Sequence, residues 1–328
     1  MSDIYMEGWI WGTIAAVVWV LGMQLLRMRR SVYIAGEKDV EYIYKLLFSV
    51  EFPFVWLKGL ELALFNTFPY QPVYARLSIN KKFIEAPELR YDDTELLLRE
   101  AWEHGVNSER GCRAMTRLNT IHSHFNIDNR SYLYVLAMFV VVPVRLINEY
   151  EFRTLTEHEI KCACNAITLM GRAMGITDLP ISYADYEKIV DDEYASDKMR
   201  VDPRGKAIAN SVLAMFLRPA PAFIHPFARR IVYALLDDPV RRALDYPKQP
   251  RILRHFAKAL LLTRAYIIKW MFPTRPLSWA ILRTPKVPGG APRLQKYRKA
   301  GCPFAYPDEY DCGRLGTWTH ANAARPIT

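Results

Sequence analysis

The chain has 328 residues and a formal net charge of +10, and its 51% hydrophobic and 13% aromatic content excludes disorder as the main state. The basic excess lies mostly after Pro203, mixed with Trp, Phe and Leu, which fits an anionic membrane surface better than nucleic acid; we expect no nucleic-acid partner. Five cysteines, an odd number without a CxxC spacing, argue against a disulfide framework or a zinc site.

The first predicted element is a membrane-spanning helix. Gly8 to Leu26 contains no charged residue, and nineteen residues at the helical rise of ~1.5 Å cover roughly 28 Å, close to the hydrocarbon thickness of a bilayer. Arg27, Arg29 and Arg30 follow directly, so the positive-inside rule predicts a luminal N-terminus and a cytosolic domain. A cleaved signal peptide is disfavoured, because neither a basic region before the run nor a small-residue cleavage site after it is present.

The rest of the chain is predicted to be helical. Apolar spacing, caps and stop signals indicate helices over residues 40–65 (broken near Pro53), 92–104, 107–125, 131–147, 157–174, 183–194 and 205–216. Thr156 and Glu159 are positioned as a capping box, and Gly105 as a stop signal. The apolar run 131–147 contains Pro143 and an arginine, which favours a buried core helix over a second span.

The C-terminal third differs in composition, because Pro and Arg become frequent from Pro219 onward. Residues 252–272 form an apolar run studded with cations, and two interpretations stay open: a helix in the membrane interface with its cations reaching outward, or an ordinary amphipathic core helix. Residues 285–328, rich in Pro, Gly and Tyr, are predicted to wrap the domain as an extended tail.

One pair of histidines is notable for its surroundings. His122 and His124 diverge by about 200° around a helix, so they cannot bind one ion together. His122 borders the apolar stripe of its helix. Periodicity alone favours a core histidine there, although a single axial ligand to haem needs the same buried, apolar position.

Several segments, in order and behind a single N-terminal anchor, resemble the fungal ER-bound oxygenase (MpaB) family, which is related to the rubber oxygenase called latex clearing protein. The resemblance extends roughly from residue 42 to 210 and weakly over 303–318. The matching segments are EFPF (51–54), ALFNT (63–67), RYDDT (90–94), RLNTIH (117–122), IDN (127–129), LYVL (133–136), RTLT (153–156), MGRAMGI (170–176) and LP (179–180).

The resemblance implies an all-α, globin-like haem domain that binds haem b. The family's histidine in the RxNxIH motif matches His122, which implies that His122 is the proximal iron ligand. Arg117 and Asn119 of the same motif are then expected to support the haem-bearing helix or to hydrogen-bond around the cofactor.

The distal RxxKT motif of rubber oxygenase matches Arg90 and Thr94, but Asp93 replaces its lysine. In this scheme O₂ binds opposite His122 and Arg90 polarises it; Arg90 has the alternatives of holding the haem propionates or forming a surface ion pair. Asp93 either accepts a proton from an intermediate or holds Arg90 in place. Residues 92–94 also read as an ordinary helix N-cap.

Five residues are candidates for an apolar pocket wall, although such spacing more often marks plain core: Phe65, Phe125, Leu133, Tyr134 and Phe139.

The sequence thus predicts a haem-dependent oxygenase, single-pass in the endoplasmic reticulum membrane, that cleaves a C=C bond in the isoprenoid chain of a lipophilic, prenylated secondary-metabolite intermediate. The expected organisation is a luminal segment (1–7), anchor (8–26), juxtamembrane linker (27–39), catalytic domain (40–218) and basic C-terminal part (219–328). The alternatives are a non-catalytic membrane-bound helical protein that binds lipids or partners, and a non-haem metalloenzyme, for which the other histidines have no convincing spacing.

Overall fold

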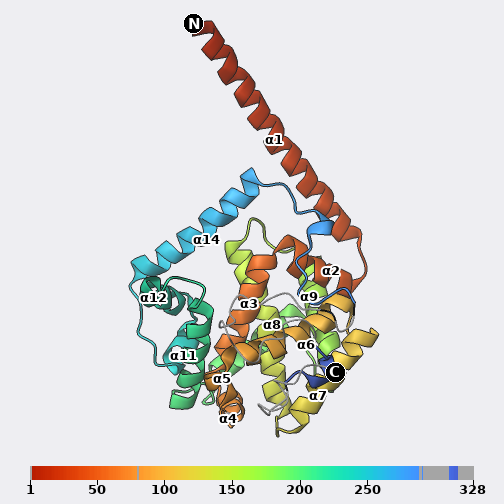
Figure 1. Ribbon diagram of the computed structural model, residues 1–328, viewed down its shortest axis with the longest axis vertical. Coiled ribbons are helices and arrows are strands. Elements are labelled where there is room, and N and C mark those ends of the chain that lie inside the picture. Colours follow the sequence, from red (N-terminus) through yellow and green to blue (C-terminus); the bar gives the residue numbers. More distant parts are fainter. Residues whose placement is uncertain (1, 80, 288–289, 291–309, 317–328) are drawn as a thin grey trace.

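Helices account for the regular structure in a computed structural model that describes residues 2–79, 81–287, 290 and 310–316 (Figure 1). The α-helices are α1 Ser2–Gly36, α2 Val40–Leu46, α3 Pro53–Thr67, α4 Gln71–Leu77, α5 Lys82–Glu85, α6 Pro87–His104, α7 Glu109–Ser123, α8 Asn129–Tyr150, α9 Glu157–Ala173, α10 Tyr183–Tyr194, α11 Pro203–Leu217, α12 His225–Leu235, α13 Asp238–Ala243 and α14 Arg251–Met271. A π-helical turn (Leu47–Glu51) and 3-10 turns at Ala222–Ile224, Leu277–Trp279 and Cys312–Arg314 complete the set. The prediction of an all-α chain behind an N-terminal apolar helix is confirmed.

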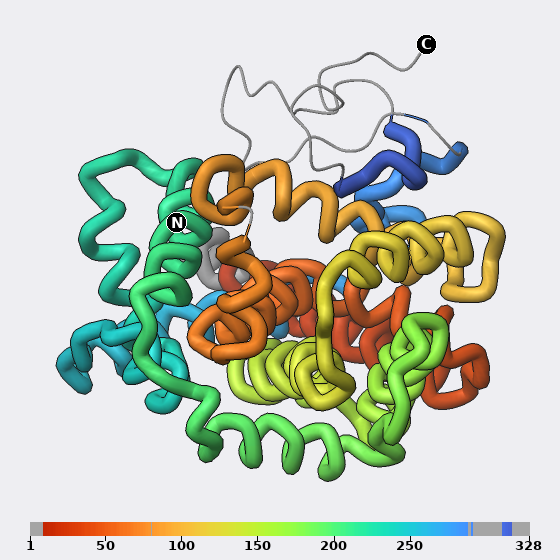
Figure 2. Tube along the Cα trace, turned by 90° about the horizontal axis from the view of Figure 1, so that it is seen from below, coloured from red at the N-terminus to blue at the C-terminus, as the bar shows by residue number. Residues whose placement is uncertain are grey.

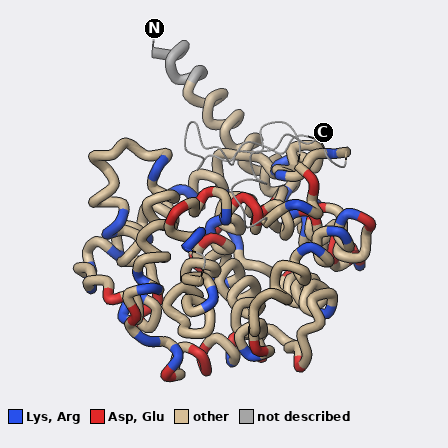
Figure 3. The backbone as a smooth tube through the Cα atoms, turned by 60° about the horizontal axis from the view of Figure 1, so that its bottom comes forward, with Lys and Arg blue, Asp and Glu red and all other residues tan. Residues whose placement is uncertain are grey.

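α1 projects from the domain (Figure 1) and is long and apolar enough to cross a membrane, with only 6% of its most apolar window buried. Figure 3 shows charged residues of both signs spread over the helical domain, whereas the described part of the projecting helix carries almost none. The predicted linker after the apolar run is itself helical as far as Gly36. The C-terminal part of α1, which includes Met23 at the end of the apolar run, packs on the domain. Met23 and Ile34 are both 2% exposed, and Arg30 forms an ion pair with Glu51 at 3.0 Å.

α8 packs against α3, α9, α10 and α14. Figure 2 shows the helical bundle from below. α8 too is long and apolar enough to span a membrane, but 72% of that window is buried, which confirms the predicted core helix. Pro143 lies inside it without ending it. The C-terminal part joins the domain through a second apolar cluster, in which side chains of α3–α6 pack against α11 and α13.

Local signals correctly located most helix ends. Thr156 and Glu159 form the predicted capping box, and Gly105 ends α6 with φ 94°, a conformation that favours glycine. Of the segment predicted as an extended tail, most residues (288–289, 291–309 and 317–328) lie outside the described ones.

Gly59 allows α3 to approach α8 closely. A Cβ on Gly59 would lie 2.7 Å from the backbone Cα of Pro143, which a flexible side chain cannot relieve. We therefore expect Gly59→Ala to lower the free energy of unfolding by about 1–3 kcal/mol, as overpacking typically does, measured by urea denaturation in detergent. Gly36→Ala, with nothing within 4 Å of the new Cβ, is the control; equal midpoints for the two variants would contradict this account of the contact.

Candidate functional site

A cavity of about 220 Å³ lies among α3, α4, α6, α7, α8 and α9. Four of the six residues predicted from the sequence as site residues line it: Arg90, Asp93 and Thr94 from α6, and His122 from α7. The remaining wall is mainly apolar, with side chains such as Leu64, Leu118 and Met170. Helices that are separate in sequence therefore bring the two candidate motifs to one cavity.

The three α6 residues do not form a helix N-cap, so that interpretation of residues 92–94 is wrong. α6 begins at Pro87, which occupies the first helical turn, where a missing backbone N–H costs no hydrogen bond. Asp93 and Thr94 consequently lie in the second turn, where the Thr94 hydroxyl donates to the Arg90 carbonyl at 2.8 Å. The helix fixes their side chains on the face that meets the cavity.

Arg90 and Asp93 form a largely buried ion pair. Arg90 Nη1 lies 3.8 Å from Asp93 Oδ2, and their side chains are 14% and 4% exposed. The guanidinium carbon of Arg90 also lies 5.3 Å from the ring centre of Phe83, within the range of a cation–π contact. These contacts position a positive charge with N–H donors at the cavity wall.

His122 presents a neutral imidazole to the cavity. Burial, and secondly the charge of Arg90, lower the pKa of His122 to about 4. Its buried Nδ1 has no hydrogen-bond partner among the described residues, and its ring centre lies 5.5 Å from that of Tyr132. An unpartnered buried nitrogen is uncommon in a structural core histidine, whereas an axial iron ligand must keep a nitrogen lone pair available.

Other half-buried histidines have partners of their own. A ring nitrogen lies 2.9 Å from the Thr284 hydroxyl for His104, 3.0 Å from the Glu37 carbonyl for His158, and 2.9 Å from the Ala220 carbonyl for His225. Within the described part of the chain, no group of three His, Cys, Asp or Glu side chains is arranged to hold a metal ion; haem iron needs only one such ligand.

Arg117 and Asn119 do not line this cavity. Arg117 Nε donates to the Leu315 carbonyl at 2.7 Å, and Asn119 Nδ2 donates to the Ala173 carbonyl at 2.9 Å. Each side chain therefore ties α7 to a distant segment, a contact that holds the helix carrying His122. Gly316, next to Leu315, has φ 69°, and a Cβ there would lie 3.8 Å from Arg90 Nη1, so a C-terminal segment also approaches the site.

Three of the five predicted wall residues line one of two cavities, whereas Leu133 and Tyr134 are buried in the core. Phe125 and Phe139 line the cavity beside His122, together with Tyr132, which the sequence did not single out. Phe65 lines a different cavity, and the Tyr134 hydroxyl donates to the Asn66 carbonyl at 3.3 Å within the core. Tyr132 has no distinguishing sequence signal, because only the fold brings the start of α8 close to His122 near the end of α7.

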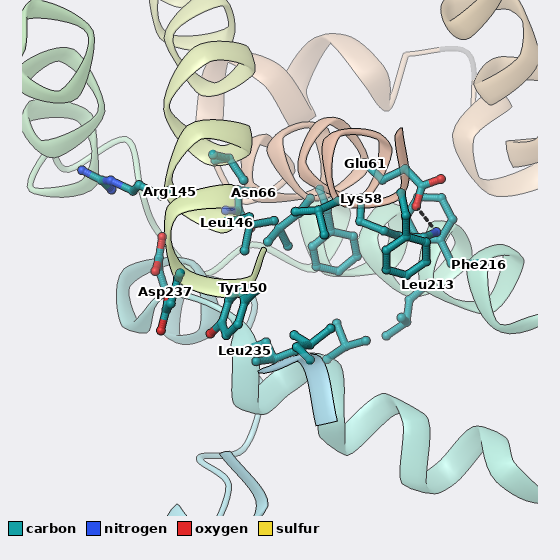
Figure 4. A pocket seen from close by; sticks show the side chains of 18 of the residues that line it. Lys58, Glu61, Asn66, Arg145, Leu146, Tyr150, Leu213, Phe216, Leu235 and Asp237 are labelled. Carbon is teal, nitrogen blue, oxygen red and sulfur yellow. Dashed lines mark hydrogen bonds and ion pairs between the residues drawn. The ribbon is translucent and has the colours of Figure 1, made fainter. Parts of the chain in front are cut away.

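A larger cavity, of about 430 Å³, lies on the other side of α3, between α8 and the helices α11, α12 and α14. Figure 4 shows its apolar middle, with Leu146, Leu213 and Leu235. Several of its charged groups are already in ion pairs: Lys58 with Glu61 at 2.5 Å, and Arg145 with Glu187 at 3.0 Å. No histidine or cysteine lines this larger cavity. The smaller cavity, which His122 lines, is therefore the better candidate for the catalytic site.

Comparison with known proteins gives consistent matches. Residues 97–265 match the family model described as "ER-bound oxygenase mpaB/B'/Rubber oxygenase, catalytic domain", a range that includes His122 but begins after Arg90–Thr94. The chain is 27% identical over 295 residues to ER-bound oxygenase mpaB' of Penicillium brevicompactum, covering 84% of this chain and 69% of that protein. It is 28% identical over 237 residues to ER-bound oxygenase mpaB of Penicillium roqueforti (strain FM164), covering 66% and 79%.

Proposed function

Because the chain belongs to the family of ER-bound oxygenases mpaB/B' and rubber oxygenases, we propose that it is a membrane-anchored, haem b-dependent oxygenase that cleaves a C=C bond in the isoprenoid chain of a lipophilic secondary-metabolite intermediate. Family membership by itself makes the chain an oxygenase that uses O₂, and it disfavours a non-catalytic membrane protein. The cofactor, the prenylated substrate and the bond cleaved are parts of the proposal.

The observation that carries the cofactor assignment is the state of His122. Its imidazole is neutral, its Nδ1 is unpartnered, and it borders an apolar cavity, which are the properties that a single axial ligand to haem requires. Haem, when bound, supplies the one-electron and O₂ chemistry that no amino-acid side chain offers. The wall residues of the cavity exclude water from that chemistry.

Arg90 and Asp93 have complementary tasks in this proposal. Arg90 directs a positive charge and N–H donors at the cavity, where they stabilise negative charge that develops on reacting oxygen atoms. Asp93, at 3.8 Å, holds the guanidinium in position. The alternative task of Asp93, acceptance of a proton, uses the same carboxylate, and Asp93→Asn distinguishes the two tasks.

The location follows from α1 and from the relatives. We propose that the chain resides in the endoplasmic reticulum membrane with α1 as its single spanning helix, its N-terminus in the lumen and its catalytic domain in the cytosol. The relatives carry "ER-bound" in their names, and Arg27, Arg29 and Arg30 follow the uncharged run of α1. A prenylated substrate partitions into the bilayer, so an anchored domain meets it at a raised local concentration.

Turnover of a prenylated phenol tests the function. The full-length protein, expressed with ample haem, is expected to show a Soret band and to consume O₂ while releasing the shortened carbonyl product, detected by mass spectrometry. A variant without residues 1–21, cut before the buried Met23, is expected to keep the Soret band and its turnover in detergent but to show lower turnover of liposome-dissolved substrate. Purified protein that contains no haem after such expression would refute the assignment of haem as the cofactor. Loss of haem on truncation would refute the proposal that α1 serves only as a membrane anchor.

A further inference from the structure

The outward side of α14 is apolar along its whole length. Six of its large exposed side chains recur three, four or seven residues apart, which places these six on one face of the helix; Leu262, 49% exposed, lies outside that face. The six are Ile252, Phe256, Leu260, Ile267, Trp270 and Met271, and Leu260 is 62% exposed. Thr263 is the polar residue among them, and no charged side chain lies on this face.

Three of the five charged residues of α14, namely Arg254, Lys258 and Arg264, contact the protein instead. Arg254 Nε donates to the Ala234 carbonyl at 3.0 Å, Lys258 forms an ion pair with Glu149, and Arg264 forms an ion pair with Glu151 at 3.0 Å. Ala257 and Ala265 are the buried residues of the helix. A surface helix of a soluble domain has the opposite arrangement, with its apolar stripe turned toward the core.

α14 ends where the apolar run of α1 ends. Gln24 Nε2 donates to the Lys269 carbonyl at 3.4 Å, and Arg27 donates to the Ile268 and Phe272 carbonyls, each at 2.7 Å. The C-terminal end of α14 is therefore level with residues 24–27 of α1, beside Leu26, the last residue of the uncharged run. From that point α14 extends across the direction of α1 (Figure 1).

We propose that α14 lies in the plane of the membrane that α1 spans, with its outward apolar face buried in the headgroup and upper acyl region. A 21-residue helix is about 32 Å long, and an apolar face of that length normally has a partner. The bilayer is the partner that continuity with α1 supplies, and an interfacial helix buries such a face by roughly 5–10 Å.

Neighbouring residues fit the same surface. Tyr266 is 66% exposed, and Trp279, in the turn after α14, is 67% exposed; both types favour the membrane–water boundary. Arg251 and Lys269 flank the apolar face and suit anionic headgroups. On the inner side, Leu261 lines the larger cavity, so α14 would separate that cavity from the bilayer.

Depth-dependent quenching tests the proposal on the full-length chain in liposomes. The environment-sensitive fluorophore NBD is attached to Ile252→Cys, Leu260→Cys or Ile267→Cys, each in a background that keeps only the buried Cys162 and Cys164, with Cys112, Cys302 and Cys312 replaced by alanine. Ile181→Cys, at a 90% exposed position between α9 and α10, is the matched control.

All three α14 labels are expected to emit at shorter wavelength than the Ile181 label. Doxyl-labelled lipid should quench most of their emission, and aqueous iodide should quench little of it. The Ile181 label is expected to show the reverse. Iodide access at Leu260 equal to that at Ile181 would overturn the proposal. Quenching by lipid at Ile267 but not at Ile252 would exclude the in-plane orientation, and protection from iodide without quenching by lipid would identify a protein partner instead.

Discussion

Replacement of His122 by alanine is expected to eliminate the Soret band of the purified protein and its O₂-dependent turnover together. The variant removes the unpartnered imidazole that we propose as the iron ligand. Loss of a residue that only hydrogen-bonds to a metal ligand typically lowers metal affinity roughly 10–100-fold, so loss of the ligand itself should lower haem affinity by at least that factor. Haem titration followed by absorbance measures this affinity, and circular dichroism confirms that the helices persist.

His124→Ala is the matched control for this experiment. His124 lies two residues away on the same turn, but it is exposed, and its Nδ1 lies 2.7 Å from the Thr120 carbonyl. It should retain full haem binding. Imidazole added to His122→Gly should restore part of the Soret band, because the small molecule can occupy the vacated ligand position. A His122→Ala protein that binds haem as tightly as His124→Ala would remove His122 from the site.

Replacement of Arg90 by glutamine is expected to lower kcat about 10²-fold while haem binding is retained, as loss of one preorganised donor at a reacting oxygen typically does. Arg90 is 14% exposed at the cavity wall, so its charge is only weakly screened by solvent. Turnover of the prenylated phenol at saturating substrate measures the effect. Arg113→Gln, at an arginine 55% exposed and paired with Asp311, is the control.

Asp93→Asn distinguishes the two tasks of the carboxylate. If Asp93 only positions Arg90, the Arg90→Gln/Asp93→Asn double variant should be no slower than Arg90→Gln alone. If Asp93 accepts a proton, the double variant should be slower and the pH dependence of kcat should change in Asp93→Asn. Unchanged rates and products in Asp93→Asn would exclude the residue from the mechanism, and unchanged kcat in Arg90→Gln would do the same for Arg90.

The sequence determined the features that depend on neighbouring residues. The uncharged run 8–26, the capping box at Thr156–Glu159 and the stop at Gly105 are local patterns, and each has its expected structure. The helix N-cap at residues 92–94 was the local error, because Pro87 initiates α6 five residues earlier. The order of the short motifs also indicated the family and singled out His122, because a motif such as RLNTIH (117–122) can be read directly from neighbouring residues.

The tertiary structure decided which helical faces meet. Arg90 and His122 are thirty-two residues apart in the chain and line one cavity, whereas Arg117 and Asn119, from the motif of His122 itself, bond to Leu315 and Ala173. Likewise, the sequence of residues 252–272 did not show that Arg254, Lys258 and Arg264 contact the domain while large apolar side chains face outward. Helical periodicity states which side chains share a face, but the partner of that face is set by packing between helices distant in sequence.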